Sequence, residues 1–306
     1  MLTALSQLGS PSNGPGYLPL SRQMADGDVV KFCQRTDDAW EIESVIIPMG
    51  ARDKTWRTLC VSSQIGCKRG CTFCQTAQMG LVRNLTVDEI LGQVRAARVV
   101  FGANVRNVVF MGMGEPMDNL ENVVAAITAM HEDCINQIPR RRITVSTVGR
   151  CDGIRRLAAL RWRRLNLAVS LNAPNDEVRS QIMPINRIEP MALLRDAIAE
   201  YPVRAGGHVL IEYVLIRGLN DKLDHARQLA EYLRGLHTCV NLIPYNPREE
   251  SPYETPDEDT VVRFQVELMS AGQLCFRRGT KGTAAMAACG QLGNLELRRA
   301  RKSEVA

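Results

Sequence analysis

Short apolar runs alternate along this chain with longer segments of helical periodicity. The runs predict strands at residues 43–48, 58–63, 107–111, 142–146, 165–171, 208–215, 240–243 and 273–276. Apolar positions three and four residues apart predict helices at about 86–101, 119–133, 190–200, 222–235 and 257–271. Strands that alternate with helices build right-handed βα units, so we expect an α/β fold around a parallel sheet or barrel.

The ends of the chain lack these patterns. Gly and Pro crowd residues 8–18, which disfavours both helix and strand. We therefore expect a flexible leader at 1–26, an N-terminal segment at 27–55, a core barrel at 56–290 and a basic tail at 291–306. In such folds the reactive groups gather at the carboxyl ends of the strands.

Composition and charge narrow the class of protein. Of 306 residues, 45% are hydrophobic and 23% are charged, which is typical of a globular chain and excludes a disordered or collagen-like one. No basic leader precedes an apolar stretch and no run of about 18 apolar residues occurs, so we expect a cytoplasmic protein without a membrane partner. The net charge of +5 permits an anionic partner without proving one.

The ten cysteines carry more information than the charge, because in an unsecreted chain of this size they indicate metal binding or catalysis. Cys67, Cys71 and Cys74 stand in GCKRGCTFC, a C-x3-C-x2-C spacing on a short loop. Gly66 and Gly70 allow tight turns there, so three thiolates can converge on one centre. Three ligands leave one iron of a [4Fe-4S] cluster open to a further molecule.

A closed site is the alternative to this open cluster. It would be a four-cysteine cluster that uses Cys60, or a zinc site. Zinc needs a fourth protein ligand, and the nearest histidine, His131, lies far along the chain from Cys74. We therefore favour the open cluster.

The flanking motifs carry a family resemblance. In order along the chain they are CVSSQIGCKRGCTFCQTAQMGLVRNLT, MGMGEPMDNLENV, SLNAPND, MPIN, NLIPYNP and AACGQL. Together they resemble the RlmN/Cfr family of radical S-adenosylmethionine (SAM) RNA adenosine methyltransferases, over roughly residues 40 to 295. The resemblance implies a TIM-like partial (βα)6 barrel with a short N-terminal extension. It also implies one [4Fe-4S] cluster per chain, which binds SAM at its open iron, and two SAM molecules per turnover.

The same resemblance implies a set of SAM-binding positions at strand ends. They are Gly114, Glu115, Ser146, Ser170, Leu171, Asn172 and Asn246. The carboxylate of Glu115 is expected to take the ammonium group of SAM. Family members usually carry a histidine where this chain has Asn172, so we expect this residue to position SAM and not to transfer protons. Without the resemblance, Gly114 and Glu115 read equally well as a strand-to-loop turn, and the serine and asparagine positions read as polar strand caps.

The resemblance further implies a reactive pair, Cys289 and Cys60, and a proton acceptor, Glu43. Cys289 takes a methyl group from one SAM, and a radical from a second SAM removes hydrogen from that methyl group, which then adds to the adenine ring. Cys60 attacks the sulfur of Cys289 and releases the base, which leaves a disulfide bond between the two cysteines. The alternatives are two inert buried thiols and a surface glutamate on an edge strand.

Two further expectations concern the surroundings of the reactive pair. Arg278 and Lys281 could supply the positive setting that a thiolate near Cys289 needs. Family members carry acidic residues where this chain has Ala284, Ala285 and Met286, so we expect the hydrogen bonding of that loop to differ. The remaining cysteines lie outside the motifs and are expected to be buried, inert thiols: Cys33, Cys134, Cys151, Cys239 and Cys275.

The expected partner is RNA. Basic runs occur at residues 140–142, 161–164, 277–281 and 298–302, and arginines on one face would bind phosphates. The resemblance implies methylation of adenosine carbon 2 in 23S ribosomal RNA and perhaps transfer RNA by a monomer, with an electron donor such as flavodoxin. The alternatives are Cfr-like methylation of carbon 8, which confers antibiotic resistance, and a non-catalytic iron–sulfur remnant. The remnant is suggested by the short segment before Glu43, where family members carry a longer accessory domain.

Overall fold

One sheet of ten strands organises the molecule. The structure, a computed structural model, describes residues 16–49, 56–135, 137–248, 251–279, 282 and 284–305. The order in the sheet is β1-β2-β3-β4-β7-β8-β9-β10-β11-β12. The bounds are β1 Leu20–Asp26, β2 Val29–Arg35, β3 Glu41–Pro48, β4 Trp56–Cys60, β7 Asn104–Phe110, β8 Ile143–Thr147, β9 Asn166–Ser170, β10 Val209–Leu215, β11 Thr238–Pro244 and β12 Cys275–Arg277.

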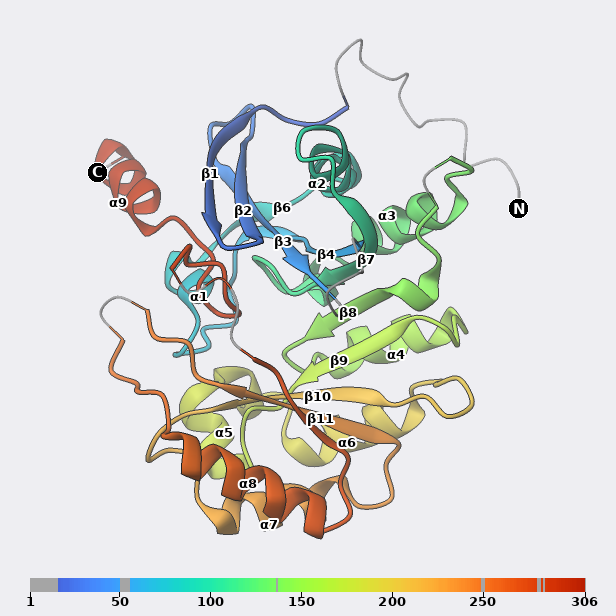
Figure 1. Ribbon diagram of the computed structural model, residues 1–306, viewed down its shortest axis with the longest axis vertical. Helices are drawn as coiled ribbons and strands as arrows, with labels where there is room; N and C mark the ends of the chain where they lie inside the picture. Colours follow the sequence, from blue (N-terminus) through green and yellow to red (C-terminus); the bar gives the residue numbers. More distant parts are fainter. Residues whose placement is uncertain are drawn as a thin grey trace.

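The sheet has an antiparallel part and a parallel part. Strands β1 to β4 pair antiparallel as a meander. From β4 to β12 every pairing is parallel. The parallel strands follow an arc, with helices along its outer side (Figure 1). Six βα units ending in a last strand form this arc, which confirms the expected partial (βα)6 barrel.

The helices cover the arc largely where their apolar periodicity predicts. The expected helices appear as α2 Val87–Val99, α3 Leu120–Glu132, α6 Met191–Glu200, α7 Leu223–Leu233 and α8 Glu258–Ser270. Thr86 caps α2 in a capping box with Glu89. The helices that the sequence patterns did not predict are α1 Gln75–Met79, α4 Cys151–Ala159, α5 Asp176–Ile182 and α9 Leu295–Val305. In α4 the cause is Gly153, a poor helix former that is needed because a Cβ there would lie 2.6 Å from the Cβ of Met117.

The prediction of a flexible leader at 1–26 is wrong for residues 20–26, which form strand β1. Residues 1–15 lie outside the part of the chain that the structure describes. Strand β2 was also missed, because Lys31 and Gln34 interrupt its apolar pattern although both are buried. The expected basic tail contains α9, which contacts α1. In the described part of the chain, no helix is long and apolar enough to span a membrane.

Candidate active site

The cysteine loop lies inside a small hairpin after the first strand of the barrel. Its two strands, β5 Gln64–Gly66 and β6 Leu81–Asn84, pair antiparallel and enclose the loop and α1. Gly66 has a φ of +73°, and a Cβ there would lie 1.8 Å from the carbonyl oxygen of Gly80. Gly70 also has a φ of +73°. Both glycines therefore make the turns that the sequence predicts.

The loop presents three buried or half-buried thiols to one another. Burial is the main cause that raises the pKa of Cys71, and the nearby sulfurs of Cys74 and Cys67 raise it further. Among the residues described here, the only Cys, His, Asp or Glu trio whose ligand atoms lie within 4.8 Å of one another is Cys33, Glu41 and Glu43. The loop sulfurs are thus spread more widely than a single ion requires, and they are shielded from water. This donor set fits an iron–sulfur cluster better than zinc.

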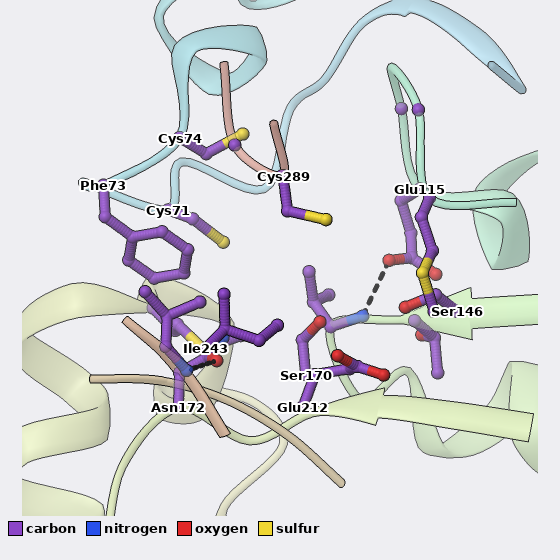
Figure 2. Close-up of a pocket in the computed structure, with 18 of the residues that line it drawn as sticks. Cys71, Phe73, Cys74, Glu115, Ser146, Ser170, Asn172, Glu212, Ile243 and Cys289 are labelled. Carbon is purple, nitrogen blue, oxygen red and sulfur yellow. Dashed lines mark hydrogen bonds between the residues drawn. The ribbon is translucent and has the colours of Figure 1, made fainter. Parts of the chain in front are cut away.

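A pocket opens beside this loop, and we call it the cluster-side pocket. It lies at the carboxyl ends of β7 to β11, where a barrel carries its chemistry. Figure 2 shows Cys71 and Cys74 on one side, Glu115 and Ser146 on the other, and Cys289 between them. The side chains that line it include Cys71, Cys74, Glu115, Ser146, Ser170, Asn172, Glu212 and Cys289.

Glu115 is held at the end of β7 by backbone donors. Its two carboxylate oxygens accept hydrogen bonds from the amides of Met117 (3.1 Å) and Val148 (2.9 Å). Burial raises its pKa to about 7, although these bonds lower it. At Gly114 φ is +100°, and a Cβ would come within 2.8 Å of the backbone nitrogen of Gln64. The pocket is therefore shaped around a carboxylate that lacks a cationic partner among these contacts, which suits an ammonium group.

The other expected SAM positions differ in how they face this pocket. Ser146 and Ser170 line it. Leu171 is fully buried in the core, so it can reach a ligand only through its backbone. Asn172 lines the pocket with a φ of +57°, which asparagine tolerates, and its Oδ1 accepts a hydrogen bond from the amide of Val214 at 2.9 Å. Asn246 does not border this pocket.

A buried arginine that the sequence patterns did not indicate ties two of these strand ends together. Arg179 of α5 has no exposed surface. Its guanidinium donates to the carbonyl oxygens of Val148 (2.5 Å) and Leu171 (3.2 Å). The loops after β8 and β9 are thereby fixed around the pocket.

A second and larger space lies inside the arc of strands, and we call it the arginine-lined cavity. Its arginines are Arg141, Arg142, Arg204, Arg277 and Arg278. Cys60 and Asn246 also line it. Four residues border both this cavity and the cluster-side pocket: Met111, Glu212, Ile243 and Cys289.

The structure brings the predicted reactive pair together. Cys60, at the end of β4, and Cys289 both line the arginine-lined cavity. Burial raises the pKa of Cys60 to about 12; Cys289 also raises it, and Arg278 lowers it. The Cys289 thiolate is the main cause that raises the pKa of Arg278. Arg278 is therefore placed where it was expected, beside both thiols, whereas Lys281 lies outside the described residues.

Hydrogen bonds hold the segment that carries Cys289 from three sides. The amide of Gln75 in α1 donates to the carbonyl oxygen of Gly290 at 2.7 Å. The side chain of Asn246 donates to the carbonyl oxygen of Cys289 at 3.3 Å. Lys31 of β2 donates to the carbonyl oxygen of Met286 at 3.1 Å. Hydrogen bonds to backbone carbonyl groups thus hold this loop, in which Ala284, Ala285 and Met286 stand at positions where acidic side chains were expected in the family.

Glu43 lies in the N-terminal meander and lines neither pocket. Its carboxylate is fully buried and pairs with Lys31 at 2.8 Å and with Arg22 at 3.2 Å. It also accepts a hydrogen bond from the amide of Gly293 at 3.1 Å. These contacts link the meander to the Cys289 segment and satisfy the charge of Glu43.

The remaining cysteines follow expectation with one correction. Cys33, Cys151, Cys239 and Cys275 are buried, but Cys134 is exposed, because it follows the end of α3. All ten cysteines carry free thiols, so the expected disulfide bond is not present in the structure.

The basic runs are divided between the cavity rim and internal contacts. Arg140 stacks on Trp162 at 4.2 Å from the ring centroid, which joins the run at 140–142 to the one at 161–164. Arg298 stacks on Trp40 and donates to the carbonyl oxygen of Met79 at 3.0 Å, so it contributes to packing α9. Four arginines of these runs line the arginine-lined cavity. They are Arg141, Arg142, Arg277 and Arg278.

Comparisons with known proteins agree with this site. Residues 61–231 match the model of the radical SAM superfamily. A probable dual-specificity RNA methyltransferase RlmN 1 of Protochlamydia amoebophila is 47% identical over 283 residues, which are 92% of this chain and 78% of that protein. A dual-specificity RNA methyltransferase RlmN of Geobacter sulfurreducens is 45% identical over 91% of this chain and 74% of its own.

A solved structure extends this likeness to the fold. The crystal structure of a radical SAM methyltransferase from Sphaerobacter thermophilus superposes with a TM-score of 0.83 at 41% identity, over 90% of this chain and 80% of that one. Cluster loop, pocket and matching relatives therefore agree, and the chain belongs to the RlmN family of the radical SAM superfamily.

Proposed function

We propose that this chain methylates carbon 2 of an adenosine in 23S ribosomal RNA and in transfer RNA. Its relatives are named as RNA methyltransferases of dual specificity. The observation that carries the proposal is the place of Cys289, whose side chain borders both the cluster-side pocket and the arginine-lined cavity. A nucleophile at such a junction can receive a group on one side and deliver it on the other.

The cluster-side pocket is the proposed place of the cofactors. Cys67, Cys71 and Cys74 would hold one [4Fe-4S] cluster per chain, and SAM would bind beside it, with two molecules used per turnover. When bound, these groups supply methyl donation and hydrogen-atom abstraction, which protein side chains cannot. Glu115 would receive the ammonium group of SAM. The other proposed contacts in this pocket are Gly114, Ser146, Ser170 and Asn172, with Leu171 through its backbone. Asn246 as a SAM contact stays a prediction, because it lines the arginine-lined cavity instead.

Cys289 would carry the methyl group, and Cys60 would end the reaction. The thiolate of Cys289 attacks the methyl donor, and the modified cysteine later becomes bonded through that carbon to the base. The thiolate of Cys60 then attacks the sulfur of Cys289. The bond between that sulfur and the carbon breaks, its electron pair passes to the carbon side, and the carbon takes up a proton to become the methyl group of the base. The two sulfurs stay joined as a disulfide until a reductant separates them. Arg278 lowers the pKa of Cys60, against the effect of burial.

Glu43 as proton acceptor remains a prediction. Its ion pair with Lys31 and its bond to Gly293 support a role in positioning the Cys289 segment instead. We further propose a core barrel at 56–290 in a cytoplasmic monomer that receives electrons from an external donor such as flavodoxin.

Nucleoside analysis tests the proposed reaction. Anaerobically reconstituted protein is incubated with SAM, a flavodoxin reducing system and either unmodified 23S ribosomal RNA or transfer RNA, and the digested RNA is analysed by mass spectrometry. We expect 2-methyladenosine with the native chain and none with Cys289→Ala. Formation of 8-methyladenosine, or no modified nucleoside from protein loaded with iron and SAM, would contradict the proposal.

A further inference from the structure

The arginine-lined cavity, which lies inside the barrel and is bordered by Cys289, has an unusual number of polar side chains on its wall. Barrel interiors are normally filled by branched apolar side chains. Here the strand residues that line the arginine-lined cavity include apolar ones, Val109, Leu210 and Ile243, but each of six successive strands also contributes a polar side chain: Thr58, Asn107, Thr144, Asn166, Glu212 and Asn241. A cavity of this size and polarity suits a polar ligand better than a packed core.

Glu212 is the one carboxylate among the described residues that line this cavity. It stands in the middle of β10 and is only 5% exposed. The side chain of Asn241 on β11 donates to its Oε2 at 2.9 Å. Its Oε1 is buried and has no hydrogen-bond partner. Because a buried acceptor without a donor is costly, this oxygen points to a ligand that brings one.

The neighbours of Glu212 narrow the chemistry of that ligand. Glu212 borders both the cavity and the cluster-side pocket, as Cys289 does, so a ligand bound by Glu212 occupies a space that the reactive sulfur also borders. Figure 2 shows the two side chains entering the pocket from different sides. Arg278 interacts electrostatically with Glu212 and with both thiols. The other arginines that line the same cavity suit the phosphates of a polynucleotide. The ligand therefore combines a hydrogen-bond donor at Glu212 with anionic groups elsewhere in the cavity, as a nucleotide does.

We propose that the carboxylate of Glu212 accepts a hydrogen bond from the exocyclic amino group of the target adenine and so selects a purine that carries an amino group on carbon 6. This inference rests on the proposed function. In adenine the amino group and carbon 2 lie on either side of ring nitrogen 1, so a base with carbon 2 at Cys289 directs its amino group to the same edge of the ring. Hypoxanthine also has hydrogen on carbon 2 but has a carbonyl oxygen in place of that amino group, and two acceptors would face each other.

The first test changes the substrate and leaves the protein intact. A synthetic RNA stem-loop of the methylated sequence carries either adenosine or purine riboside, which lacks the amino group, at the target position. We expect kcat/KM with purine riboside to be lower by roughly tenfold to a hundredfold. Equal rates for the two RNAs would overturn the inference while leaving the methyltransferase activity intact. Absence of product from both would instead contradict the proposed function.

The second test uses Glu212→Met, which removes the acceptor at similar size, with Glu200→Met as a control for the loss of one negative charge on the surface. In Glu212→Met we expect the preference for adenosine over purine riboside to fall below about threefold, whereas Glu200→Met keeps it. SAM affinity and the methylation of Cys289 without RNA, measured by dialysis and by protein mass spectrometry, should stay within about twofold of the native chain. A tenfold loss of SAM affinity with the base preference unchanged would assign Glu212 to SAM and overturn the inference.

Discussion

The two spaces that meet at Cys289 differ in charge and in the parts of the fold that line them. The cluster-side pocket is built from strand ends and the cysteine loop, and it contains the carboxylate of Glu115. The arginine-lined cavity is built from inward side chains of the strands and bears five arginines. A carboxylate suits a cationic cofactor and arginines suit a polyanion. The fold thus offers two spaces suited to ligands of opposite charge, and Cys289 borders both.

The largest expected effect lies on the cluster side. Replacing Cys71 by Ala should remove the iron, which we expect at about four atoms per chain after anaerobic reconstitution, because the remaining two thiols cannot hold a cluster. RNA affinity should change by less than about twofold, since the arginines are untouched. Cys151→Ala, which removes a buried thiol elsewhere, should keep its iron. Iron that survives in Cys71→Ala would break the assignment of the two spaces.

The contact between the N-terminal meander and the segment that carries Cys289 should also be sensitive. Lys31→Met leaves the buried carboxylate of Glu43 without its closest cation, and breaking such a pair costs about 3–5 kcal/mol. The free energy of unfolding in denaturant measures this loss. The double variant Lys31→Met with Glu43→Gln removes both charges and should recover most of it. If the single variant is as stable as the native chain, the ion pair does not anchor the Cys289 segment.

The cavity side should respond to charge and salt. Reversing Arg141 and Arg142 to Glu should weaken RNA binding by at least about tenfold and reduce the salt dependence of log affinity by about two. Iron content and SAM binding should stay the same. The exposed arginines Arg163 and Arg164, which do not line the cavity, provide the matched reversal. Equal loss from both pairs would mean that RNA binds by general surface charge.

The pH dependence of the release step should separate Cys60 from Cys289. Burial raises the pKa of Cys60 to about 12, so only a small fraction is thiolate near neutral pH and that fraction grows tenfold with each pH unit. The lifetime of the RNA–protein adduct should therefore shorten by about tenfold per unit between about pH 7 and pH 9. A lifetime that is independent of pH would show that Cys60 is not the attacking group.

The sequence predicts the two spaces unequally. Motifs with unusual spacing, such as the cysteine loop and the residues around Glu115, identify the cluster-side pocket, because strand ends in a parallel sheet gather at one edge. The cavity is formed by single inward residues such as Glu212 and Asn241, and one polar residue inside an apolar run does not by itself predict a cavity. A lone charge inside the apolar run HVLIEYVLI was the available signal. Strand β2 was not predicted for a similar reason. The charge of Lys31 interrupts its apolar pattern, and the partner that allows Lys31 to be buried, Glu43, is distant in sequence.

The place of Cys289 between the two spaces is tested most directly by the fate of RNA in two single variants. The native chain, Cys60→Ala and Cys289→Ala are reconstituted, checked for iron and incubated with SAM, reductant and RNA, and the products are separated on a denaturing gel. We predict that Cys60→Ala accumulates a slow RNA-linked band that ribonuclease removes, because the base bonds to Cys289 and is not released. Cys289→Ala should bind SAM and RNA yet form no such band. A band in both variants, or in neither when both are folded and loaded, would contradict the account.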